Sequence, residues 1–285
     1  MKYYVLYNPH SNNEKGHETV EETKKQLPED TPFYDVTGIN DYAKFFESIP
    51  SDASVLLIGG DGTLNHFIND VSKLTFNTDI YYKAAGTGND FLKDVKDSPN
   101  ELGFYKINKY LEDLPTVYVK GKEYLFLNGI GYGIDGYCCE VGDKLRVEST
   151  KPVNYTSIAI KGLLFHYKPT KATITVDGKK HEFRNVWLAP TMNGRFYGGG
   201  MIPTPNQDRL AKPKTLSIMV YHCPNKLKAL MIFPSIFKGE HVSHKDTVEV
   251  FTGKDITVEF DSPRALQVDG ETILDVKKYR AAVNN

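Results

Sequence analysis

The residues best suited to chemistry form a glycine cluster that ends an apolar run. Val55–Ile58 leads directly into the segment Gly59-Gly60-Asp61-Gly62-Thr63-Leu64-Asn65. Glycines lack Cβ, so their backbone N–H groups can turn toward a phosphate, and a following helix adds the positive end of its dipole. Asp61 would repel a bare phosphate unless it holds Mg²⁺, orients the loop or binds a polar nucleoside group. A strand-to-helix turn capped by Asp61 or Thr63 is the alternative interpretation.

A second segment of the same kind follows about one strand and one helix later. It reads Gly86-Thr87-Gly88-Asn89-Asp90-Phe91. Alone it is a weak signal, because Asn89 or Asp90 could simply cap a helix. Paired with the first cluster at the equivalent place on a neighbouring strand, it indicates a binding site for a phosphate-bearing ligand.

The elements that must position these loops alternate between strand and helix. Strands are expected at residues 3–7, 33–36, 55–58 and 80–84, and helices at 16–27, 41–49, 64–74 and 89–95. This rhythm is typical of a doubly wound α/β sheet, in which ligands bind beyond the carboxyl ends of the strands. The loops expected there begin at Asn8, Thr37, Gly59 and Gly86.

The sequence of the rest of the chain predicts β-hairpins. Predicted strand pairs are 116–120 with 123–130, 172–176 with 181–188, and 248–251 with 256–260. Two helices are expected at 153–166 and 227–237. The sequence therefore predicts a doubly wound α/β domain over residues 1–113 and a larger, antiparallel β-rich domain over 114–276.

Composition and charge narrow the class of protein. The 40% hydrophobic and 25% charged fractions are those of a folded globular chain. Three cysteines, two of them adjacent, do not make a disulfide framework or a structural zinc site, so we expect a reducing cytoplasm. We expect no signal peptide and no membrane span.

The near-neutral net charge of −1 conceals an asymmetry. Residues 1–113 carry 11 Lys and Arg against 19 Asp and Glu, whereas residues 114–285 carry 24 against 17. Either one part faces an anionic surface, or solvated charges are sorted by chance. The basic residues are scattered and form no nucleic-acid motif, so no nucleic-acid partner is expected.

One glycine motif matches a known binding pattern but lacks the structural context that this pattern requires. Gly131-Tyr132-Gly133-Ile134-Asp135-Gly136 matches a dinucleotide-binding fingerprint. It lacks the βαβ unit, with an acidic residue about 20 positions on, that the fingerprint requires. We therefore expect no nicotinamide or flavin site there.

Four segments together resemble the diacylglycerol kinase catalytic-domain family, which includes bacterial lipid kinases and sphingosine and ceramide kinases. They are the two glycine loops at 59–65 and 86–91, Gly129–Asp135, and Gln267-Val268-Asp269-Gly270-Glu271 near the end. NAD kinases share the first loop, but the second points to the lipid kinases. The resemblance spans nearly the whole chain and implies an NAD kinase/diacylglycerol kinase-like fold, with residues 277–285 returning to complete the first domain.

The resemblance also implies an activity and its residues. ATP with bound Mg²⁺ would meet a lipid between the two domains. A carboxylate would accept the proton of the attacking hydroxyl. Glu271, Asp269 and Asp61 are the candidate catalytic residues, and Asp61 is also the candidate for holding the Mg²⁺ end of the nucleotide. The candidate nucleotide-binding residues are Asn8, Pro9, His10, Ser11, Thr37, Gly59, Gly60, Asp61, Gly62, Thr63, Asn65, Gly86, Thr87, Gly88, Asn89 and Asp90.

Departures from the family pattern leave points open. Asn12 and Asn13 stand where the first loop usually has a glycine, and Lys212-Pro213 stands where bacterial members place an Asp-Gly whose carboxylate helps to hold a structural Mg²⁺. Asp208 could substitute only if its loop were shifted, so no structural metal is assigned. Asp269-Gly270 read alone predicts a plain hairpin turn.

A kinase that acts on a lipid has to reach an anionic membrane surface, and the basic second part suits that task. Residues 227–237, flanked by lysines, are either an interfacial element or an ordinary core helix with lysines at its edges. We expect a cytoplasmic, peripherally membrane-associated lipid kinase. The alternatives are a small-molecule kinase of the NAD kinase type and a non-catalytic nucleotide- or lipid-binding relative.

Overall fold

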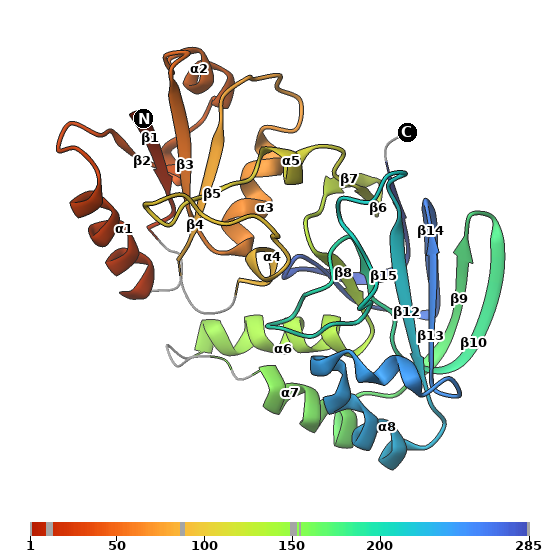
Figure 1. Cartoon of the computed structure of the whole chain (residues 1–285). Helices are drawn as coiled ribbons and strands as arrows, with labels where there is room; N and C mark the ends of the chain where they lie inside the picture. The colour runs from red at the N-terminus through yellow and green to blue at the C-terminus, as the bar shows by residue number, and fades with distance from the viewer. Residues whose placement is uncertain (1, 10–13, 86–88, 149–152, 154, 284–285) are drawn as a thin grey trace. The chain divides into compact units, whose positions relative to one another are not determined.

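The computed structural model describes residues 2–9, 14–85, 89–148, 153 and 155–283 of the chain. It divides into two compact units, Met1–Glu112 and Asp113–Asn285. Figure 1 shows the elements of each unit with their labels. The predicted classes of the two domains, α/β followed by β-rich, are confirmed.

The first unit alternates strands and helices, as the sequence predicts. Its elements are β1 (Lys2–Tyr7), α1 (Glu14–Gln26), β2 (Phe33–Asp35), the 3₁₀ turn η1 (Val36–Gly38), α2 (Tyr42–Glu47), β3 (Ala53–Gly59), α3 (Asp61–Asp70), β4 (Ile80–Ala84), α4 (Asp90–Lys93), β5 (Tyr105–Lys106) and α5 (Asn108–Leu111).

These strands form one sheet in the order β2-β1-β3-β4-β5. β1, β2, β3 and β4 pair in parallel, and the short β5 is antiparallel to β4. Every residue of β3 is buried, as expected for a central parallel strand covered on both faces. α3 buries Leu64, Phe67 and Ile68, at the spacing of one helix face.

The second unit holds the remaining elements. They are β6 (Thr116–Val119), β7 (Lys122–Leu125), β8 (Gly129–Tyr132), α6 (Ile134–Glu148), α7 (Tyr155–Lys161), the π-helical turn η2 (Gly162–His166), β9 (Thr170–Val176), β10 (Lys179–Leu188), β11 (Thr191–Met192), β12 (Leu216–His222), α8 (Lys226–Ile232), the 3₁₀ turns η3 (Phe233–Lys238) and η4 (Glu240–Ser243), β13 (Val248–Gly253), β14 (Asp255–Val268) and β15 (Glu271–Ala282).

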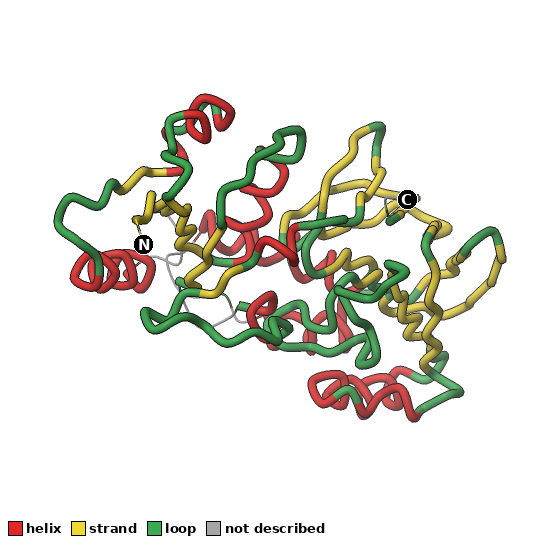
Figure 2. Tube along the Cα trace, turned by 45° about the horizontal axis from the view of Figure 1, so that its top comes forward, coloured by secondary structure: helices red, strands yellow, loops and turns green. Residues whose placement is uncertain are grey.

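The strands of this unit close into an antiparallel barrel. Neighbours run β14-β8-β11-β12-β10-β9, and β9 pairs back with the first half of β14. β15, β6 and β7 extend the sheet beyond β14, and β13 pairs with β12. One core fills the barrel, and a second lies beneath α6, α7 and α8. Figure 2 shows these strands in yellow and the helices in red.

Three expectations for this unit are wrong. The predicted partners 248–251 and 256–260 are not paired with each other, because β13 pairs with β12 and β14 pairs with β15, β8 and β9. The predicted strand 123–130 is two strands, β7 and β8, broken at residues 126–128. Residues 277–282 belong to β15 and pair with β14 and β6, so the end of the chain lies in the second unit rather than completing the first.

The glycine motif at residues 131–136 has a packing role. Gly131 lies in β8, whose neighbours β11 and β14 are both antiparallel, so no βαβ unit starts there. The helix that follows, α6, lies close against β14, and a Cβ at Gly136 would lie 2.0 Å from the carbonyl oxygen of Ala265. The spacing of glycines thus lets a helix approach a strand. Every helix in the described part of the chain is too short or too polar to cross a membrane.

Candidate functional site

The order of the first sheet creates a binding edge between β1 and β3. The chain leaves β1 toward β2 on one side and returns to β3 on the other, and open α/β sheets bind ligands at such a reversal. Asn8 follows β1 directly, and its Nδ2 donates to Thr63 Oγ1 at 3.4 Å in the first turn of α3. The structure therefore brings together two of the predicted nucleotide-binding segments.

The first glycine loop makes a tight passage from β3 into α3. Gly59 is the last residue of β3, and Gly60 is the N-cap of α3. A Cβ at Gly59 would lie 2.5 Å from the Cβ of Thr63, so no larger residue fits. The first turn of a helix has N–H groups without intrahelical partners and the positive end of the dipole, which together favour an anion.

Asp61 joins the two glycine loops. Its Oδ2 accepts the backbone N–H of Asp90 at 2.8 Å, and its Oδ1 accepts that of Phe91 at 3.4 Å. Asp61 stands at the start of α3 and the two donors at the start of α4. The carboxylate therefore ties Asp90 and Phe91, the end of the second glycine segment, to the start of α3. This is the loop-orienting role that the sequence left open beside Mg²⁺ binding.

A buried tyrosine reinforces this junction and was missed by the sequence analysis. Tyr82 donates its hydroxyl to the carbonyl of Gly59 at 2.8 Å and accepts Asn89 Nδ2 at 2.5 Å. Asn89 in turn caps α4 by accepting the N–H of Leu92 at 2.8 Å. Burial, and then the nearby Asp61, raise the pKa of Tyr82, so the phenol stays neutral. Its only sequence signal is a tyrosine two residues before the end of the predicted strand.

The remaining predicted nucleotide-binding residues are less informative. Thr37 is exposed, and its backbone N–H and hydroxyl both donate to Asp35, at 2.8 and 2.7 Å. Pro9 is exposed and follows Asn8. Thr63, Asn65 and Asp90 are buried, and Gly60, Asp61, Gly62 and Asn89 are half-buried. His10, Ser11, Gly86, Thr87 and Gly88 lie outside the described residues.

In the second unit, Asp269 accepts three backbone N–H groups. The donors are Leu127 at 2.5 Å, Asn128 at 2.8 Å and Gly129 at 2.9 Å. Asp269 lies in the turn between β14 and β15 with φ 47°, and Gly270 follows with φ 98°, as the hairpin interpretation expects. The carboxylate thus fixes the segment that breaks β7 from β8, and we assign Asp269 a positioning rather than a proton-accepting role.

Glu271 lies two residues further on, at the start of β15. It is exposed and stands opposite Val268 in the hairpin. The next residue, Thr272, donates its hydroxyl to Asp143 of α6 at 2.6 Å, which holds the start of β15 against that helix. Glu271 is therefore a carboxylate at the surface of a fixed turn, a position from which it can meet a substrate hydroxyl.

Asp135 is a buried carboxyl that the sequence analysis did not place among the site residues. It is 8% exposed, and burial raises its pKa to about 6 against the effect of the Gly136 N–H, which donates to Oδ1 at 2.9 Å. A Cβ at Gly131 would lie 1.6 Å from Asp135 Oδ2 and 2.6 Å from Gln267 Nε2. This packing explains the glycine at 131 and links Asp135 to the strand that leads to Asp269.

The place of the family's structural Mg²⁺ does not fit a metal in this chain. Lys214 is half-buried there and donates its ammonium to the carbonyl of Arg209. Burial and then Arg209 lower the pKa of Lys214 to about 8, while Asp113 and Asp208 act in the opposite direction. Asp208 itself accepts the N–H of Leu210 at 3.0 Å. The described residues contain no group of three or more metal-ligating side chains.

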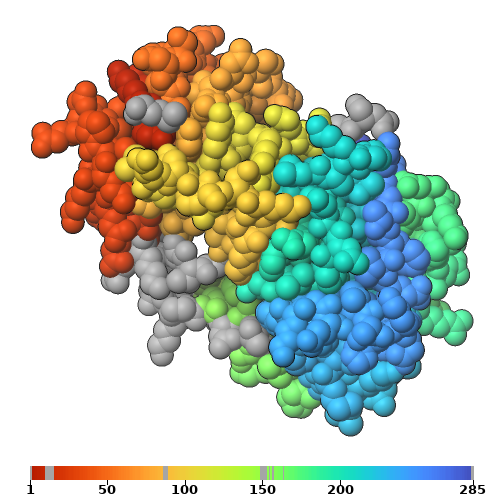
Figure 3. Space-filling model, in the orientation of Figure 1, coloured from red at the N-terminus to blue at the C-terminus, as the bar shows by residue number. Residues whose placement is uncertain are grey.

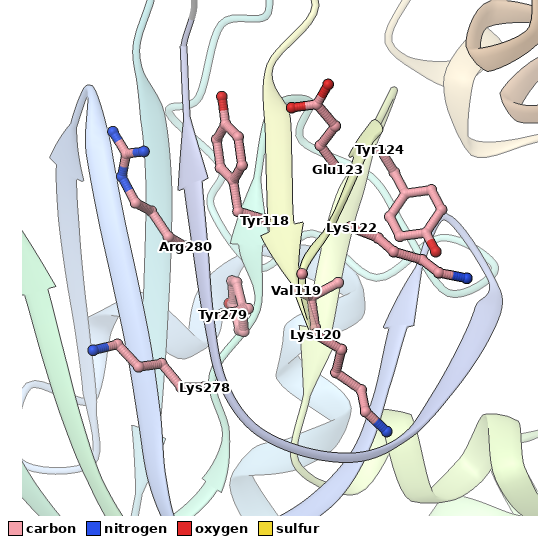
Figure 4. Close-up of a pocket in the computed structure, with 10 residues that line it drawn as sticks. Tyr118, Val119, Lys120, Lys122, Glu123, Tyr124, Lys278, Tyr279 and Arg280 are labelled. Carbon is pink, nitrogen blue, oxygen red and sulfur yellow. The ribbon is translucent and has the colours of Figure 1, made fainter.

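A depression lies over β6, β7 and β15 of the second unit (Figure 4). Tyr118, Lys120, Tyr124 and Arg280 are among its lining residues. None of the candidate catalytic or nucleotide-binding residues is among those that line it.

Replacement of Asp269 tests its positioning role. Asp269→Ala leaves three backbone N–H groups without their acceptor, so we expect the free energy of unfolding to fall by about 3 kcal/mol. Asp269→Asn keeps one acceptor oxygen and tolerates the positive φ, so the loss is about 1 kcal/mol. Urea unfolding measures both. Equal stability of Asp269→Ala and the wild type would contradict the role.

Asp135 predicts a pH dependence of stability. Because its folded pKa is raised, this carboxyl stabilises the fold below about pH 4, and that contribution is lost as pH rises through 6. Asp135→Asn does not titrate, so it should gain up to about 3 kcal/mol relative to the wild type between pH 4 and pH 7. Urea unfolding across this range measures the gain, with exposed Asp52→Asn as the charge control. A difference in stability between Asp135→Asn and the wild type that does not change with pH would contradict the raised pKa of Asp135.

Comparison with known proteins covers both units. Residues 2–113 match the model of the diacylglycerol kinase catalytic domain, and residues 128–281 match that of the YegS C-terminal NAD kinase beta sandwich-like domain. YtlR of Bacillus subtilis (strain 168), a candidate lipid kinase by its name, is 27% identical over 80% of this chain and 76% of its own length. A diacylglycerol kinase of Mycobacterium tuberculosis (strain H37Rv) is 26% identical over 74% of this chain and 67% of its own.

The fold is also that of a solved structure. A crystal structure of a diacylglycerol kinase from Bacillus anthracis (strain Sterne) matches with a TM-score of 0.61 and 17% identity, over 99% of this chain and 93% of that one. The first family model ends at the division between the units, only residues 114–127 lie between the two matches, and together they cover most of the chain. The chain belongs to the diacylglycerol kinase catalytic-domain family and is an enzyme of the lipid kinase type.

Proposed function

We propose that this enzyme transfers the γ-phosphoryl group of Mg²⁺-ATP to a hydroxyl of diacylglycerol or a related lipid. The observation that carries the proposal is the junction of the two glycine loops by Asp61 at adjacent strand ends. That junction supports a site for a nucleotide phosphate, and the family supports a lipid as the acceptor. Mg²⁺ arrives as part of the nucleotide substrate.

The reaction assigns one proton transfer to the protein. The lipid hydroxyl oxygen forms a bond to the γ-phosphorus while the bond from that phosphorus to the β,γ-bridging oxygen breaks, and ADP leaves. Glu271 accepts the hydroxyl proton. The backbone N–H groups of the first glycine loop, with the dipole of α3, stabilise the negative charge of the phosphates. The rest of the catalysis is positioning, which is the task of Asp61 and Asp269.

The lipid substrate sets the place of action. A long-chain lipid stays in the bilayer, so the enzyme must act as a peripheral protein on an anionic membrane surface, and we propose the cytoplasmic side. The excess of Lys and Arg after residue 113, 24 against 17 Asp and Glu, supports this placement.

A substrate screen tests the function. Purified protein is incubated with labelled ATP and Mg²⁺, and with either dispersed diacylglycerol, a mixed lipid extract or NAD. We expect labelled phosphate in a lipid. Label in NAD alone would favour the NAD kinase alternative, and no label in any acceptor would overturn the proposal.

Glu271 is tested by a conservative pair of variants. Glu271→Gln cannot accept a proton, so turnover should fall by about 10²–10⁴-fold with ATP binding intact, whereas Glu271→Asp keeps a carboxylate and a larger share of the turnover. The exposed side chain should change stability by less than about 0.5 kcal/mol. Near-normal turnover by Glu271→Gln would remove this residue from the base role.

Asp61 is tested by separating its charge from its hydrogen bonds. Asp61→Ala loses both acceptor oxygens and should lower the free energy of unfolding by about 2 kcal/mol. Asp61→Asn keeps an acceptor and should cost less than about 1 kcal/mol. If the charge also holds Mg²⁺, Asp61→Asn needs more Mg²⁺ for half-maximal ATP binding, as titration calorimetry would show. An unchanged Mg²⁺ dependence would leave Asp61 as a positioning residue only.

A further inference from the structure

Four large apolar side chains are exposed on two neighbouring helical segments of the second unit. They are Ile160 at 43% exposed, Phe165 at 74%, Leu227 at 69% and Met231 at 76%. The first two belong to α7 and η2, and the others to α8. We call these four side chains the α7–α8 patch.

A direct contact brings the two segments together. The ammonium of Lys226, the first residue of α8, donates to the carbonyl of Leu164 in η2. Phe165 and Leu227 each follow one of the two joined residues in the chain. Figure 1 shows the turn that continues α7 beside α8, and in Figure 3 the green atoms of the first segment adjoin the blue atoms of the second at the bottom of the view.

α8 has apolar side chains on two faces, one packed against the core and the other exposed in the described part of the chain. Ala229 and Ile232 are buried in the core beneath the helices. Leu227 and Met231, four residues apart, share the opposite face and point away from that core. A helix that is hydrophobic all round is normally buried on all sides. We therefore expect the exposed apolar face of α8 to bind a partner.

The two segments that carry the patch are basic. Residues 155–168 and 226–238 contain five lysines and no Asp or Glu. Lys228 pairs with Asp246 of a neighbouring segment. The other four lysines are exposed: Lys161, Lys168, Lys226 and Lys238. Apolar side chains amid lysines are the pattern of a surface that lies in the headgroup region of an anionic bilayer.

We propose that the α7–α8 patch is the surface on which the second unit docks to an anionic membrane. The inference deepens the proposed lipid kinase function and rests on it. Phe165, Leu227 and Met231 enter the headgroup–acyl boundary, and the lysines meet lipid phosphates. A second copy of the chain fits less well, because a two-fold contact would bring the same lysines against one another.

Vesicle binding without ATP tests the surface. The wild type and the double variant Phe165→Ser/Met231→Ser are sedimented with vesicles of phosphatidylcholine alone or mixed with phosphatidylglycerol. We expect the wild type to prefer the anionic vesicles and the double variant to bind them about tenfold more weakly. Both replaced side chains are largely exposed, so the variant should keep the wild-type urea midpoint.

Two further variants are controls. Val250→Ser/Leu274→Ser removes exposed apolar side chains from strands of the same unit and should bind as the wild type does. Lys161→Gln/Lys238→Gln should weaken binding to anionic vesicles by about fivefold per lysine and leave binding to phosphatidylcholine unchanged.

The outcomes separate this proposal from the proposed function. Equal vesicle binding by the wild type and Phe165→Ser/Met231→Ser would overturn the docking surface, whatever the activity. So would a dimer in solution that this double variant makes monomeric while vesicle binding persists. Loss of vesicle binding with full turnover on a dispersed short-chain lipid supports the surface. Vesicle binding by a wild type that phosphorylates no lipid would instead overturn the kinase proposal and leave the docking surface standing.

Discussion

The candidate chemistry of both units depends on carboxylates that accept backbone N–H groups. In the first unit Asp61 accepts the N–H groups that open α4. In the second, Asp269 accepts three consecutive N–H groups where the chain passes from β7 into β8. A loop has no ladder of its own to satisfy such donors, and a charged acceptor is about twice as strong as a neutral one. Each carboxylate therefore fixes the backbone that it contacts, which is the start of α4 in the first unit and residues 127–129 in the second.

This use of carboxylates divides positioning from proton transfer. Asp269 and Glu271 are two residues apart, yet the first carboxylate accepts three backbone donors and the second is exposed at the surface. Hydrogen bonds to an ionised carboxylate stabilise the charged form and make it a poorer base. Asp269 therefore fixes the turn, and Glu271 is the carboxylate that the turn presents for proton transfer. The positive φ values at Asp269 and Gly270 provide the tight reversal that places them so.

Most of the first unit could be predicted from the sequence because the signals for its strands, helices and loops are local. A buried apolar strand followed by glycines and a helix start is specific at each position, and β3, α3 and the Asp61 loop followed it. The sequence did not reveal Tyr82, because a tyrosine in a strand predicts burial but not the partner of its hydroxyl. Nor did it show that Asp61 reaches across to α4, because that contact depends on how β3 and β4 lie side by side.

The second unit was harder because its pairings are long-range. The Thr252-Gly253-Lys254 turn satisfies the local rule for a hairpin, yet β13 pairs with β12 rather than with the strand that follows. Alternating residues fit any antiparallel neighbour, so local sequence cannot choose among them. α6 was missed because its glycines oppose a helix prediction, although Gly136 is what lets α6 approach β14. The family resemblance placed residues 277–285 in the first unit, whereas the hairpin at Asp269-Gly270 leads directly into β15.

The two apolar faces of α8 show how the same residue types serve two purposes. Ala229 and Ile232 lie in a core with α6 and α7, and that core is complete without Leu227 and Met231. The fold therefore gains nothing from an apolar side chain at either exposed position, and polar residues there would leave the core intact. Apolar residues at exposed positions, set among lysines with no acidic neighbour in their own segments, need a reason outside folding. Contact with an anionic lipid surface supplies that reason, and the four exposed lysines of these segments, Lys161, Lys168, Lys226 and Lys238, have the charge that such a surface attracts.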